Sequence, residues 1–140
     1  MVNINGVGIN LMRNFLAVVL IVTTSVSYAS PCDGIDRTIV IDRAVSAEIA
    51  KQLHVSKVDV LQSFRNDAWS IIYINTHETD NAFLFYSRSP LVGHYITLWS
   101  GAASKDEEQE IADWVFHNAP GIPSKLAKCF AWHVTNNRDK

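Results

Sequence analysis

The chain has 140 residues, of which 48% are hydrophobic and 19% are charged, with a formal net charge of −2. This composition is that of a globular protein and excludes a low-complexity or disordered chain. It also contains no basic run that could hold a phosphate backbone or an anionic membrane surface, so we expect no nucleic-acid partner.

The N-terminal segment has the pattern of a secretory signal peptide. Arg13 is the only charged residue before Asp33, and an apolar run follows it over residues 15–22. Ser27 and Ala29 supply small side chains at the −3 and −1 positions, which places cleavage after Ala29. The apolar run is shorter than a bilayer-spanning helix requires, and no later segment is apolar enough to form one. We therefore expect a periplasmic or secreted protein with no membrane span in the mature chain.

With residues 1–29 removed as the signal peptide, residues 30–140 predict a single compact α+β domain. About 111 residues is the usual size of one domain. Loss of Arg13 leaves 11 basic and 14 acidic residues, so the exported domain is net acidic. The start of the signal peptide is open between Met1 and Met12, because the residues before Met12 are uncharged.

The only two cysteines are Cys32 and Cys129, close to the two ends of the exported domain. In an oxidising compartment an even pair of cysteines is more often bonded than free, so we predict one structural disulfide between them. A bridge that closes a loop of this length stabilises a fold by roughly 4–5 kcal/mol in the chain-entropy model.

The first part of the domain predicts an extended segment followed by two helices. Residues 35–41 have the composition of a short strand or extended segment that could join a sheet edge. Asp42 can cap a helix with apolar residues at helical spacing, and Ser56 with Asp59 can begin a second one. The apolar positions of the two helices are Val45, Ile49 and Leu53, then Val60, Leu61, Phe64 and Ala68.

Residues 47–61 resemble a bacterial helix-turn-helix of the DNA-binding kind, through their alanine, aliphatic and Val-Ser turn positions. That resemblance implies two helices meeting at a tight corner. DNA binding is not expected, because the chain is exported and net acidic. The second helix would also offer only Lys57 and Arg65 to phosphates.

From Trp69 the pattern becomes that of β-structure. Residues 69–76, 82–88 and 94–100 predict three strands, and the short connections between them imply an antiparallel meander. Ser104 then caps a helix with an acidic first turn, and Pro120 with Gly121 ends it. A last helix over residues 123–134 would bury Leu126, Cys129 and Phe130, with His133 as a further candidate. The predicted order is β-αα-βββ-αα, with two helical pairs packed against the meander.

Both faces of the predicted sheet are apolar, unlike a sheet with one wet side. One face is rich in aromatic residues, and strand parity leaves open which face the helices cover. The aromatic set is Trp69, Ile71, Tyr73, Phe83, Phe85, Tyr95, Thr97 and Trp99. It is either core or, in part, a docking surface.

Catalytic signatures are sparse. The five histidines include no pair at i, i+4, and the chain lacks a nucleophile elbow and a glycine-rich phosphate loop. We therefore expect a non-enzymatic protein with no cofactor, metal or catalytic residue.

Ser100-Gly101, at the end of the third predicted strand, resembles the Ser-Gly-containing loop that small periplasmic lysozyme inhibitors present to their target; Ala102 and Ala103 stand where an aromatic residue commonly follows. The expected function is protein binding, as an immunity or inhibitor protein against a toxin or hydrolase that attacks the cell envelope. The expected contacts are Glu78, Asp80, Tyr95, Trp99 and Ser100. The alternative is a small periplasmic enzyme or ligand-binding domain that uses the aromatic face as a pocket.

Overall fold

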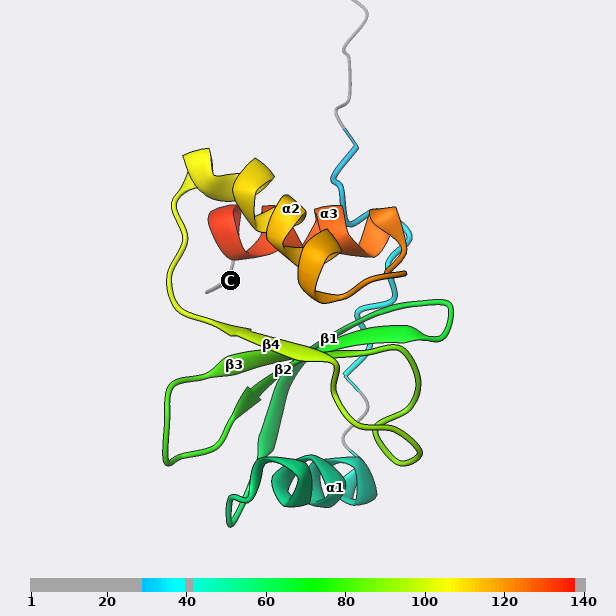
Figure 1. Cartoon of the computed structure of the whole chain (residues 1–140), viewed down its shortest axis with the longest axis vertical. Helices are drawn as coiled ribbons and strands as arrows, with labels where there is room; N and C mark the ends of the chain where they lie inside the picture. The colour runs from blue at the N-terminus through cyan, green and yellow to red at the C-terminus, as the bar shows by residue number, and fades with distance from the viewer. Residues whose placement is uncertain (1–28, 40–41, 138–140) are drawn as a thin grey trace, which may run out of the picture.

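A computed structural model describes residues 29–39 and 42–137. The signal peptide predicted from the sequence lies outside the described residues, apart from Ala29. The chain forms three layers, with a four-stranded sheet between helix α1 on one face and helices α2 and α3 on the other (Figure 1).

The sheet is an antiparallel meander in the order β1-β2-β3-β4. This confirms the α+β class, and it confirms the meander over residues 69–100 as the last three of four strands. The strands are β1 (Asp59–Asn66), β2 (Trp69–Asn75), β3 (Ala82–Tyr86) and β4 (Thr97–Ser100).

The predicted second helix over residues 56–68 is wrong, because β1 occupies this segment. A bulge between Val60 and Gln62 shifts the register, so that Val60 opposes Ile74 and Ser63 opposes Ile72. Val60 and Ser63 are three residues apart and yet lie on the same face of the sheet. In the sequence this spacing looks like the apolar spacing of a helix. The resemblance to a helix-turn-helix ends at α1, since a strand follows it.

Helix α1 (Arg43–Leu53) begins where the sequence predicts. The Asp42 carboxylate accepts a hydrogen bond from the Ala44 amide at 2.8 Å, and the helix ends at His54 in the left-handed conformation (φ 57°). The extended segment predicted at residues 35–41 contributes only an isolated bridge between Asp36 and Arg65, and residues 40–41 lie outside the described part.

The C-terminal helices are α2 (Glu108–Asn118) and α3 (Ser124–Asn136), as the sequence predicts. A 3-10 turn (Lys105–Glu107) precedes α2, where the amide and hydroxyl of Ser104 both donate to one oxygen of Glu107 in a capping box. Within the described residues the order is therefore α-ββββ-αα, with one helix before the sheet and two after it.

Two separate cores fill the layers on either side of the sheet. The aromatic face packs under α2 and α3, where Phe130 lies edge-on to Phe83 and Phe85 at ring distances of 5.1 and 5.0 Å. The opposite face packs against α1 through Ile72, Ile74, Leu84 and Tyr86.

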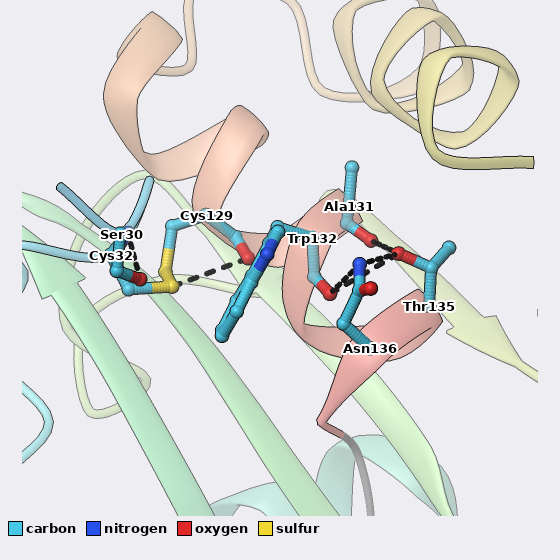
Figure 2. Close-up of a disulfide and its surroundings, with 7 residues drawn as sticks. All are labelled: Ser30, Cys32, Cys129, Ala131, Trp132, Thr135 and Asn136. Atoms are coloured by element: carbon cyan, nitrogen blue, oxygen red, sulfur yellow. Dashed lines mark hydrogen bonds between the residues drawn. A yellow bond between two sulfur atoms is a disulfide. The ribbon is translucent and has the colours of Figure 1, made fainter. Parts of the chain in front are cut away.

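The predicted disulfide between Cys32 and Cys129 is confirmed (Figure 2). It joins the segment before α1 to the middle of α3, and both cysteines are buried in the aromatic-side core. The disulfide thereby holds the N-terminal segment on the α3 side of the sheet, whereas α1, which follows this segment in the chain, lies on the opposite side.

Candidate functional site

Strand β4 is an edge of the sheet, and no other strand in the described part of the chain pairs with its outer side. The opposite edge, β1, is partly covered by Asp36, whose amide and carbonyl bond to the backbone of Arg65. An uncovered edge strand presents backbone N–H and C=O groups that can accept another strand.

The face of β4 toward α1 carries exposed apolar side chains. Leu98 is opposite Leu84 in the register, but Leu84 is fully buried whereas Leu98 is 41% exposed. Ile96, just before the strand, is also 41% exposed. Helix α1 thus covers the apolar residues of the central strands and leaves those at the β4 edge open to solvent.

A groove of about 320 Å³ lies beside this edge, at the C-terminal end of α1. We call it the edge groove. Its walls are mostly aliphatic and hydroxyl side chains, and the one charged residue among them is Asp80. The lining residues are Leu53, Val55, Ile74, Thr76, Thr79, Asp80, Ala82, Leu98 and Ser100.

The β2–β3 turn that borders the edge groove is tied to the segment after α1. The amide and hydroxyl of Ser56 donate to Glu78 Oε1 at 3.0 and 2.7 Å. His77 Nε2 lies 2.6 Å from Asp59 Oδ2. These two contacts tie the first part of the turn, at His77 and Glu78, to the segment after α1.

The same contacts set the charge of the turn. Hydrogen bonds from the side chain and backbone of Ser56 hold the pKa of Glu78 below its usual value. Hydrogen bonds from His77 and then Lys57 lower the pKa of Asp59. Both carboxylates are thus engaged within the chain, whereas the Asp80 carboxylate has no partner among the described residues.

The structure brings only some of the predicted contact residues together. Asp80 and Ser100 line the edge groove, and Glu78 lies in the turn beside it but is bound to Ser56. The predicted contacts Tyr95, Trp99 and Ser100 do not all lie on one face of the sheet. Tyr95 packs with the core under α1 and Trp99 with the core under α2 and α3, so the two rings lie on opposite faces.

Strand alternation predicted Tyr95 on the same face as Trp99. This was incorrect because the backbone is irregular just before β4. The strand begins only at Thr97, and the Ile96 amide bonds to the Phe85 carbonyl, which already faces Thr97 in the register. Sequence reasoning overlooked Leu98 as a contact residue, although alternation assigns it to the same face as Ser100.

The aromatic face is not an open surface. Trp99 packs edge-on against Phe130 of α3 at 5.6 Å, and Phe83 and Phe85 are buried under the same helix. Helices α2 and α3 therefore cover much of the face on which the sequence allowed a pocket or docking surface.

Metal-binding clusters and membrane-spanning helices are two features that can be judged for the described residues. No three histidine, cysteine, aspartate or glutamate side chains there gather into a metal-binding group. Among these residues, no helix is both long and apolar enough to cross a bilayer.

Comparisons of the chain with protein-family models, curated proteins and solved structures found no match.

Proposed function

We propose that the protein is an exported, non-enzymatic immunity or inhibitor protein that blocks a toxin or hydrolase of the cell envelope. The signal-peptide pattern supports an exported location. The disulfide between Cys32 and Cys129 also fits an oxidising compartment.

The observation that carries the proposal is the combination of a free strand edge and an adjoining groove. An extended segment of the partner would pair with β4 as a fifth strand, where main-chain hydrogen bonds supply affinity. Its side chains on the α1 side would contact Leu98, and one would enter the edge groove beside Asp80.

Charge indicates the kind of segment that would bind. Asp80 is the only charged residue that lines the edge groove, and its carboxylate is without a partner in the described structure. The segment that follows β4 is strongly acidic, with exposed Asp106 and Glu110. The attraction between these carboxylates and a basic partner would speed its capture at low ionic strength.

The contacts of the turn support binding without a large ordering cost. Ser56 with Glu78, and Asp59 with His77, hold the first part of the turn in place before any partner arrives. A surface that is ordered in advance loses less conformational entropy on association.

A deletion strain with matched variants tests the proposal. We expect loss of the gene to make cells sensitive to an envelope toxin or hydrolase of their own kind. The wild-type gene should restore protection. Leu98→Asp should not restore it, because it puts a charge on the free face of β4. Phe116→Asp is the control, since Phe116 is a similarly exposed apolar residue, at 39%, on α2 across the sheet.

A photo-crosslinker at position 98 or 116, used in the producing cells, identifies the contact directly. A partner crosslinked from position 98 and not from 116, whose activity the purified protein inhibits, would support the proposal. A deletion strain with no sensitivity, together with no crosslink from position 98, would overturn it.

A further inference from the structure

A second cavity, of about 350 Å³, lies at the other end of α1 from the edge groove. We call it the serine cavity. Its walls come from the start of α1, the β1–β2 hairpin and the loop after β3. The lining residues are Asp42, Val45, Val60, Ser63, Arg65, Asp67, Ala68, Trp69, Ser70, Ile72, Ser89, Pro90 and Leu91.

The floor of this cavity is polar where the rest of the sheet face is apolar. Ser63 opposes Ile72 and Ser70 opposes Arg65 in the β1–β2 register, so all four side chains project toward α1. Ser63 and Ser70 are only 9% and 8% exposed. No hydrogen bond joins either hydroxyl to a described residue, and neither oxygen is among the fully buried side-chain atoms, so both can meet a molecule in the cavity.

The loop that walls the cavity is held in place. The side-chain amide of Gln52 on α1 donates to the carbonyls of Pro90 and Gly93, both at 3.0 Å, and its oxygen accepts from the Tyr86 hydroxyl at 2.9 Å. A glutamine that joins a helix, a strand and a loop in this way fixes the position of the loop relative to α1 and β3. The wall that Pro90 contributes to the cavity is thus held by the fold.

Three charged side chains, Arg65, Asp42 and Asp67, also line the cavity. The Arg65 guanidinium binds Asp36 through Nη2 at 2.6 Å and has further N–H donors. Asp42 uses one oxygen to cap α1, which leaves the other, and Asp67 has no partner among the described residues. Between these groups the walls are aliphatic, through Val60 and Ile72 among others.

We propose that the serine cavity binds a small zwitterion, an aliphatic amino acid. Its carboxylate would accept hydrogen bonds from the hydroxyls of Ser63 and Ser70 and from Arg65. Its ammonium group would lie toward Asp42 and Asp67, and its side chain would contact the aliphatic wall. The volume is at the small end of the range for ligand pockets and suits a molecule of this size. The inference does not depend on the proposed function, since the edge groove lies elsewhere.

Titration of the ¹⁵N-labelled, disulfide-bonded protein with L-leucine, followed by NMR, tests this inference. We expect saturable shifts at the amides of the cavity walls, with a Kd of about 1 mM or tighter. Two analogues each lack one charge: 3-methylbutylamine has no carboxylate, and 4-methylpentanoate has no ammonium group. Each should bind at least about tenfold more weakly, because one set of polar groups is left without a partner.

Variants locate the site independently of the analogues. Ser63→Ala with Ser70→Ala should weaken L-leucine binding about tenfold or more, and Ser124→Ala, at an exposed position on α3, should leave it unchanged. The absence of shifts at the cavity walls up to about 10 mM ligand would show a cavity filled by water only and overturn the inference. Equal binding of both analogues, or full affinity in the folded double variant, would overturn it as well.

Discussion

Removal of the disulfide should cost the fold much of its stability. The bridge joins cysteines 97 residues apart. In the chain-entropy model a loop of this length removes about 16 cal/mol/K from the unfolded state, or about 4.7 kcal/mol at 25 °C. Replacing Cys32 and Cys129 by alanine also removes two buried sulfur atoms from the aromatic-side core. We therefore expect the free energy of unfolding to fall by about 4–5 kcal/mol, a large share of the 5–15 kcal/mol typical of a domain.

Guanidinium denaturation followed by far-UV circular dichroism measures this loss. Ser30→Ala is the control, because it removes only the hydroxyl that accepts a hydrogen bond from the Cys32 amide and leaves the bridge intact. Mass spectrometry of the non-reduced protein should show both thiols blocked. A loss below about 1.5 kcal/mol would refute the loop-entropy reasoning for this bridge. Two alkylatable thiols in the exported protein would refute the bridge itself.

Three other substitutions and one mass measurement have expected outcomes. Phe130→Ala should lower the free energy of unfolding by about 3–5 kcal/mol in urea denaturation, since the ring is fully buried among other aromatic rings. Asp42→Ala should cost about 1 kcal/mol, seen as a lower melting temperature, because α1 loses its N-cap. Because the pKa of Glu78 is lowered in the folded state, its contribution is present above its unfolded value near 4.5 and is lost as the pH falls through the folded value. Ser56→Ala should reduce this acid-dependent loss in urea midpoints measured across that range. The intact mass of the exported protein should correspond to a chain that starts at Ser30.

Elements with an undisturbed periodicity could be predicted from the sequence. Helix α2 combines an acidic first turn with a Pro-Gly stop, and β2 is a run of isoleucine and aromatic residues that favour a strand. The disulfide followed from the number of cysteines and the expected compartment. These signals are local or depend only on composition, so packing did not alter them.

Elements that depend on distant pairing could not be predicted. The bulge in β1 gives Val60 and Ser63 a helical spacing, and the hairpin turn at Asp67 lacks the Asn-Gly or Asp-Gly signal that identifies such turns. The serine cavity was also out of reach, because Ser63 and Ser70 face the same space only once that hairpin has formed. The irregular backbone just before β4 places the Tyr95 ring on the α1 face of the sheet, whereas regular alternation would have placed it on the aromatic face.

Unequal coverage of the sheet explains why both candidate sites lie on the α1 side. Helix α1 has 11 residues, so it is about 16 Å long and roughly 10 Å wide. The strands of β1 and β2 have 8 and 7 residues and run for about 25 Å, and four strands extend about 15–20 Å across. One such helix cannot cover that face, whereas α2 and α3 side by side can cover the other (Figure 1). The face under α1 therefore stays open at both ends of the helix. At one end the opening is apolar and meets a free strand edge, which suits a protein segment. At the other it has serine hydroxyls and charged side chains, which suit a small polar molecule.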